Sequence, residues 1–224
     1  DGATDDGVPS VIVIEAARII QSLGVKPKRT IRFALWSGEE QGILGSIAYI
    51  EKHLATRPTD KSLYGLDRLA KWATQFPITK GPEYDQLKAY FNLDNGAGKI
   101  RGIYAENNVA AAPLLKKWLA PFGSMSASTV VASRTDGTDH EYMQAVGLPG
   151  FQFIQDPLDY DSRVHHSSID TLDHAPPDDV RQAATILAAM LWQAANDDKV
   201  LPRPPLPTAP SKSNPFKVED PDKE

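Results

Sequence analysis

Four short polar strings in the sequence contain residue types that can bind a divalent metal ion. They are Asp5-Asp6, Glu39-Glu40, Asp94 and His165-His166. Clustered carboxylates repel each other and raise each other's pKa, so a fold tolerates them only where a cation compensates. Carboxylate and imidazole together, in a chain with no cysteine, form a ligand set suited to Zn²⁺ or another divalent first-row ion. The sequence therefore indicates metal chemistry, provided that these strings meet in space.

Each string taken alone has a plainer interpretation. An acidic pair in a loop is usually a solvated cap, and a His pair is more often structural than metal-binding. Asp94 is followed by Asn95-Gly96 and could form an Asx turn. The conjunction of the four strings favours metal binding, because most of them follow predicted strands, where α/β folds keep their active sites.

The elements that must position these residues alternate between helix and strand. Val11, Ile14, Ala17 and Ile20 recur at helical spacing and predict a helix over 9–24. Residues 30–36 are typical of a buried strand that leads into the Glu39-Glu40 loop, and a helix over about 43–55 follows. Strand, glycine-containing loop and helix in this order form half of a βαβ unit.

The rest of the chain continues the same alternation. We expect strands at 90–94, 102–104, 128–133 and 150–154, and helices at 109–121, 138–146 and 178–196. Residues 57–85 form an excursion from this core, with a short helix around Leu66, Leu69, Trp72 and Phe76. We expect residues 1–200 to form one α/β domain. The segment 201–224 contains seven of the 18 prolines and is expected to be a mobile tail.

Composition narrows the classes of partner. The 224 residues are 41% hydrophobic and 24% charged, which is ordinary for a globular protein with a real core. The net charge of −5 argues against a nucleic-acid-binding surface. No apolar run approaches the roughly 18 residues of a membrane span. The sequence opens within a polar string that leads directly into a helix, so we interpret it as a truncated piece of a longer protein.

Five strings, spread in order over roughly residues 1–200, carry a family resemblance. They are GATDDG (2–7), PKRTIRFALWSGEEQGILGS (27–46), FNLDNG (91–96), GTDHEYMQAVGLPG (137–150) and HHSSIDT (165–171). With them the sequence resembles the dinuclear zinc exopeptidases that include secreted bacterial leucyl-type aminopeptidases and carboxypeptidase Q. The resemblance implies a three-layer αβα fold with a central mixed, mostly parallel sheet, whose first strands are missing from this chain.

The resemblance also implies a role for each matching residue. Asp5 corresponds to the carboxylate that bridges two zinc ions, often joined to the next residue by a cis peptide bond. Glu40 and His166 correspond to ligands of one ion and Asp94 to a ligand of the other. Glu39 corresponds to the general base, and His165 stands where some relatives stabilise the oxyanion.

The family pattern includes one more ligand, a His about twenty residues upstream of Asp5, which these 224 residues do not contain. We therefore expect two zinc ions in the full-length protein and one strongly bound ion in this piece. The implied substrate is a short peptide, and the implied location is secreted or periplasmic. The oligomeric state is not predicted.

Several alternatives stay open at this point. Aminopeptidase activity is the first expectation, followed by carboxypeptidase or dipeptidase activity, glutaminyl cyclisation, and a receptor-like module without catalysis. Asp139-His140 is interpreted either as support for the metals or as a helix cap with an exposed imidazole. Arg163 meets either a substrate carboxylate or a surface partner, and His174 is expected at the surface.

Overall fold

The computed structural model describes residues 1–210 except 61, 64 and 73. The chain forms two compact units. The first contains residues 1–35, 91–135 and 151–202, and the second contains residues 36–90, 136–150 and the described residues from 203 onward.

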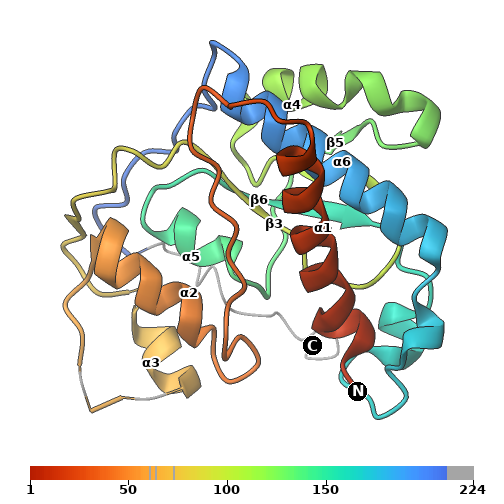
Figure 1. Cartoon of the computed structure of the whole chain (residues 1–224). Helices are drawn as coiled ribbons and strands as arrows, with labels where there is room; N and C mark the ends of the chain where they lie inside the picture. Colours follow the sequence, from red (N-terminus) through yellow and green to blue (C-terminus); the bar gives the residue numbers. More distant parts are fainter. Residues whose placement is uncertain (61, 64, 73, 211–224) are drawn as a thin grey trace. The chain divides into compact units, whose positions relative to one another are not determined.

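A mixed four-stranded sheet forms the centre of the first unit (Figure 1). Its strands are β3 (Tyr90–Asn92), β6 (Gly150–Gln155), β4 (Ile100–Tyr104) and β5 (Thr129–Val131), in that spatial order. β4 pairs with β5 in parallel and with β6 in antiparallel orientation. The predicted α/β class with a mixed central sheet is confirmed.

The helices of the first unit are α1 (Val8–Ser22), α4 (Ala112–Leu119) and α6 (Pro177–Asn196). The short 3₁₀ segments Val109–Ala111 and Ala120–Met125 extend α4 at both ends. α1 lies along α6 (Figure 1), and α6 contacts β4. The buried side chain of Gln182 on α6 bonds both the amide and the carbonyl of Ile100, which fixes this helix on the sheet.

The predicted helix over 9–24 is confirmed as α1, and of the four residues whose spacing predicted it only Ile20 is buried. Val11 and Ile14 are 54% and 57% exposed, whereas Ile12 and Ala16 are fully buried. The sequence contains apolar residues on both faces of this helix, so spacing alone does not select the face that packs on α6.

The second unit contains α2 (Leu44–Tyr49), α3 (Gly65–Trp72) and α5 (His140–Ala145). The π-helical segment Ile50–Leu54 continues α2, and β1 (Ala55–Thr56) pairs antiparallel with β2 (Thr79–Lys80). Its core gathers side chains from all three helical regions, among them Ile47, Ile50, Leu54, Trp72, Tyr142 and Met143. The predicted helices over 43–55, within 57–85 and over 138–146 are confirmed.

The predicted buried strand over 30–36 is wrong. The structure assigns no strand to these residues, and Phe33 and Leu35 are 38% and 55% exposed. A strand is defined by its hydrogen-bonded neighbour, and the two sheets assigned in the described part of the chain do not include this segment. The predicted half βαβ unit is therefore not formed here.

The start of the proline-rich segment contacts the folded chain. Leu201 is buried, and the carbonyl of Pro202 accepts a hydrogen bond from Asn108 in the first unit. In the second unit Arg203 donates to the carbonyls of Tyr84 and Leu87. Mobility of 201–224 stays a prediction, since 211–224 lie outside the described residues.

Within the described part of the chain, the helices are too short or too polar to cross a membrane.

Candidate metal centre

Asp5 lies in a short turn, Ala3–Gly7, just before α1. The buried carboxylate of Asp170 accepts hydrogen bonds from the amide and the hydroxyl of Thr4, at 2.8 and 2.7 Å, and from the amide of Asp5 at 3.0 Å. The peptide bond between Asp5 and Asp6 is cis, as the resemblance implies. Asp170 thus fixes the backbone of Asp5 against the segment that carries the His pair.

The two histidines follow a tight helical segment, Tyr160–Val164. The amide of His165 donates to the carbonyl of Tyr160 at 2.9 Å, and the amide of Ser167 donates to that of Val164 at 3.0 Å. His166 lies between them with φ of 54°, in the left-handed region that non-glycine residues seldom adopt. Such backbone strain costs on the order of 1–3 kcal/mol and clusters at functional sites.

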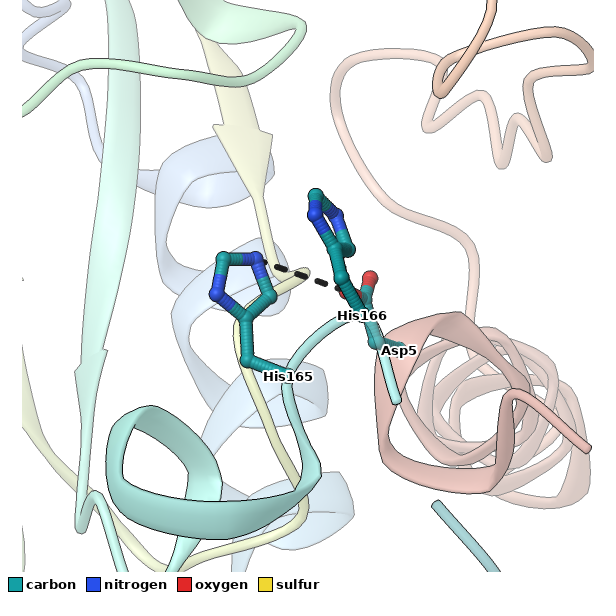
Figure 2. Close-up of side chains that lie close together, drawn as sticks. All are labelled: Asp5, His165 and His166. Carbon is teal, nitrogen blue, oxygen red and sulfur yellow. Dashed lines mark ion pairs between the residues drawn. The ribbon is translucent and has the colours of Figure 1, made fainter. Parts of the chain in front are cut away.

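The structure brings Asp5, His165 and His166 together (Figure 2). Nε2 of His166 lies 3.5 Å from Oδ2 of Asp5, and Nε2 of His165 lies 3.8 Å from the same oxygen. One ligand atom from each of the three residues falls within 4.8 Å of the other two. The imidazole rings lie next to each other, with centroids 3.9 Å apart.

These separations fit a zinc ion better than direct hydrogen bonds. A hydrogen bond between these atoms would bring them to about 2.7–3.2 Å. Two ligands that each lie about 2.0–2.2 Å from a tetrahedral zinc ion are roughly 3.4 Å apart. The spacing of His166 and Asp5 matches that value, whereas the spacing of His165 is longer. The donor set present therefore fits zinc, and His166 fits the position of a ligand more closely than His165.

Tyr160 connects Asp5 with the neighbouring loops. Its hydroxyl donates to Oδ2 of Asp5 at 3.1 Å, and its ring stacks on His165 with centroids 4.8 Å apart. Burial raises the pKa of Tyr160 well above its ordinary value, and the negative charges of Asp5 and Asp94 raise it further, against the hydrogen bond from Asn95. The hydroxyl therefore stays protonated and acts as a donor.

Asp94 lies on the loop after β3, in the same unit as Asp5. Its negative charge acts on Tyr160, whose hydroxyl donates to Asp5. The backbone carbonyl of Asp94 accepts a hydrogen bond from the amide of Gly96 at 2.9 Å, which forms a backbone turn, and the side-chain bond of an Asx turn stays a prediction. Asp94 is not part of the cluster of Figure 2, and its role as a ligand stays a prediction.

Glu39 and Glu40 lie in the second unit, on the tight turn before α2. The carbonyl of Glu39 accepts hydrogen bonds from the amides of Gly42 and Ile43, at 2.9 and 2.7 Å. Gly45 is required here, because a Cβ atom at this position would lie 2.7 Å from the carbonyl oxygen of Ser37. Glu39 is half-buried and Glu40 is exposed. Since the units are not placed relative to each other, convergence of these carboxylates with Asp5 stays a prediction.

Asp139 and His140 do not form the exposed cap that one interpretation assumed. His140 is fully buried, and the Asp139 side chain makes no capping bond to α5. Instead it accepts a hydrogen bond from Ser46 on α2, the helix that follows Glu39 and Glu40. Asp139 therefore fixes the helix that presents this acidic turn.

Two further residues near the His pair can be placed. His174 was expected at the surface, but it is mostly buried, and its Nδ1 lies 2.6 Å from Oδ2 of Asp159. This pair joins the two ends of the loop that carries His165 and His166. Arg163 is exposed on the same loop, and its contact with a substrate stays a prediction.

The fold and the cluster together define the class of the protein: a mixed α/β protein whose carboxylate and imidazole side chains are suited to binding zinc. The model of Peptidase family M28 matches residues 1–191, and the chain belongs to this family.

Named relatives agree with this membership. Carboxypeptidase Q of Mus musculus is 32% identical over 202 residues, which cover 90% of this chain and 37% of that protein. Aminopeptidase YwaD of Bacillus subtilis is 24% identical over 202 residues, or 88% of this chain and 39% of the relative. The chain thus spans well under half of the length of these relatives.

Solved structures show the same fold. The Peptidase M28 precursor from Shewanella amazonensis superposes with a TM-score of 0.67 at 28% identity, covering 92% of this chain and 40% of that one. A zinc aminopeptidase from Bacillus subtilis gives a TM-score of 0.60 at 21% identity, over 88% of this chain and 43% of the other.

Sequence reasoning did not identify Asp170 and Tyr160 as site residues. Asp170 lies within the string HHSSIDT without a role of its own, and Tyr160 lies outside the five strings. Neither carries a local signal, because their partners Thr4 and Asp5 are more than 150 residues away.

Proposed function

We propose that the protein is a zinc-dependent exopeptidase that hydrolyses peptide bonds of short peptides. The observation that carries this proposal is the approach of His166 and His165 to one oxygen of Asp5, in a chain of Peptidase family M28. The unusual backbone of His166 and the fixation of Asp5 by Asp170 support a site built for a ligand, because a surface ion pair requires neither.

The proposed ligand set follows the family pattern. Asp5 bridges two ions, His166 and Glu40 bind one of them, and Asp94 binds the other. The approach of both imidazoles to Oδ2 of Asp5 supports binding of the first ion, and the bridge to a second ion rests on the family pattern. Binding by Glu40 requires the second unit to present its acidic turn to the first.

Zinc, when bound, would lower the pKa of a water molecule and polarise the carbonyl of the scissile bond. Glu39 is proposed to accept a proton from the attacking water and to deliver it to the leaving amine. His165 is proposed to donate a hydrogen bond to the oxyanion. Its stacking on Tyr160 supports this role, because a ring with a fixed orientation is a better-organised donor.

The finer part of the proposal is the end of the peptide, amino or carboxyl, from which residues are released. Aminopeptidase activity is the first reading, and the relative named Aminopeptidase YwaD supports it. Carboxypeptidase activity is the second reading, and the higher identity to carboxypeptidase Q supports it. The proposed secreted or periplasmic location has no further support from the described residues.

The test combines elemental analysis with three substrates: an aminoacyl-nitroanilide, an N-blocked dipeptide and a peptide with N-terminal glutamine. Zinc-dependent hydrolysis of the first, lost on chelation and restored by zinc, supports an aminopeptidase. Hydrolysis of the blocked dipeptide in its place supports a carboxypeptidase. Cyclisation of glutamine, or the absence of both zinc and turnover, would contradict the proposal.

A further inference from the structure

A row of three amide side chains, two buried and one exposed, runs from the sheet toward the proposed metal ligand Asp5. Asn92 on β3 donates to Gln152 on β6 at 2.8 Å, and Gln152 donates to Asn95 at 2.8 Å. Asn95 donates to the Tyr160 hydroxyl at 3.4 Å, which donates to Asp5 at 3.1 Å. All five residues belong to the first unit.

The hydrogen bonds of this row all point in one direction. An ionised carboxylate can only accept, so the Tyr160 hydroxyl must donate to Asp5. The oxygen of that hydroxyl then accepts from the amide nitrogen of Asn95, whose carbonyl oxygen is left to accept from Gln152. Aligned donors polarise one another, so the row presents Asp5 with a stronger donor than an isolated phenol would.

The placement of the Tyr160 ring depends on Gly96, which has no side chain. Gly96 has φ of 100°, and a Cβ atom there would lie 3.3 Å from the Tyr160 ring. The ring also stacks on His165. The ring is therefore packed against Gly96 and His165, and its hydroxyl makes two hydrogen bonds that packing alone does not need.

Buried amides in a sheet need a reason, because each must find partners to offset its desolvation. Gln152 is 2% exposed and Asn92 is 5% exposed, and they pair across adjacent strands. Two apolar side chains of similar size would pack the same sheet position without polar groups. What the amides add is a defined orientation for Asn95 and, through it, for the hydroxyl of Tyr160.

We propose that Tyr160 is a positioning residue for Asp5, oriented by the row Asn92, Gln152 and Asn95. It holds Oδ2 of Asp5 in the orientation that faces His166 and balances part of the carboxylate's charge. This inference rests on the proposed function, because it assumes that Asp5 binds zinc. Mutation of a residue that hydrogen-bonds to a metal ligand typically lowers metal affinity by 10–100-fold.

The test is a double-mutant cycle read by zinc affinity, measured by competition with a chelator. Tyr160→Phe keeps the ring against Gly96 and His165 and removes only the hydroxyl. Gln152→Met keeps the length of the buried side chain and interrupts the row of hydrogen bonds at Gln152, which is separated from Tyr160 by Asn95. Tyr104→Phe on β4 is the matched control, since it removes a hydroxyl of the same unit outside the row. The melting temperature of each metal-free variant shows whether it folds.

Tyr160→Phe is expected to weaken zinc binding by about tenfold, and to alter the visible absorption spectrum of the Co²⁺-substituted protein. Gln152→Met is expected to produce a smaller loss in the native background and no further loss in the Tyr160→Phe background. Tyr104→Phe is expected to leave affinity and spectrum unchanged.

Equal zinc affinity of the native protein and Tyr160→Phe would overturn the role of Tyr160 and leave the proposed function intact. Additive losses in the double variant would overturn the row as the device that orients it. A native protein that binds no zinc would overturn the proposed function and, with it, this inference. If Gln152→Met does not fold, Asn95→Ala replaces it, because Asn95 is exposed.

Discussion

The carboxylate of Asp170 accepts hydrogen bonds from both the backbone amide and the hydroxyl of Thr4, 166 residues away in the sequence. Both side chains are buried, at 3% and 2% exposure. Through this contact the start of the chain is fixed on the loop that follows His166. The distance between Asp5 and His166 therefore depends on the carboxylate of Asp170.

We predict that Asp170→Asn destabilises the protein and loosens the proposed zinc site together. The amide nitrogen of Asn would face one of the backbone donors of Thr4 and Asp5, so one buried donor loses its acceptor at a cost of about 1–3 kcal/mol. Urea unfolding of the metal-free protein measures the first effect, and chelator competition measures the second.

Asp178→Asn is the control for this change. Asp178 lies in the first turn of α6, is 88% exposed and pairs with Arg181 on the same helix. Its loss should change the free energy of unfolding by no more than about 0.5 kcal/mol. An Asp170→Asn protein as stable as this control would contradict the role given to Asp170.

We predict opposite outcomes for the two acidic residues before α2. Glu39→Gln should reduce kcat by several orders of magnitude and leave zinc content unchanged, because Gln cannot accept the proton from water. Glu40→Gln should reduce zinc affinity, because an amide is a weaker ligand than a carboxylate. Kinetics and elemental analysis on the same preparations separate them. Zinc loss in Glu39→Gln with retained turnover would reverse the assignment.

The two adjacent histidines should likewise differ. His166→Gln is expected to lower zinc affinity, since its imidazole lies at ligand spacing from Asp5. His165→Gln is expected to retain zinc and lower kcat by about 10²–10³-fold, the usual cost of removing one oxyanion donor. Zinc content, kcat and KM of each variant are the measurements. A greater loss of zinc in His165→Gln would show that the longer spacing belongs to the true ligand.

Acid sensitivity of the first unit should depend on Asp197. The hydrogen bonds from Lys117 and Trp118 on α4, and from the amide of Lys199, lower the pKa of Asp197 below its ordinary value of 3.8. A folded-state pKa below the unfolded one gives a contribution to stability that is complete above 3.8 and declines as the pH falls further. The advantage of the native protein over Asp197→Asn should therefore shrink below pH 3.8. A difference in Tm that stays constant from pH 6 to 3 would rule this out.

Local patterns predicted much of the fold and part of the site. The apolar spacing of α6 and the short apolar runs of β4 and β6 were sufficient to locate these elements. The apolar spacing of α1 was not sufficient to identify its buried face, because Val11 and Ile14 are as apolar as the residues that pack. The strand expected at 30–36 failed for a related reason: an apolar run shows that a segment can pair, and the pairing itself depends on a partner.

At the site, the motifs predicted the residues that can bind metal, and the contacts that orient them came only from the structure. The string around His166 led to Asp5 because both belong to a recognisable ligand set. Tyr160 and Asp170 act through hydrogen bonds between distant segments, and such bonds leave no periodicity or spacing in the sequence. They are found only once the loops are placed.

The most direct test of the zinc site is X-ray absorption at the zinc edge, on the native protein and on His166→Gln. We predict a first shell of oxygen and nitrogen at about 2.0–2.2 Å in the native protein, with outer-shell scattering from imidazole that decreases in His166→Gln. Native protein without bound zinc, or imidazole scattering that is unchanged by the substitution, would contradict the assignment of Asp5 and His166 as ligands.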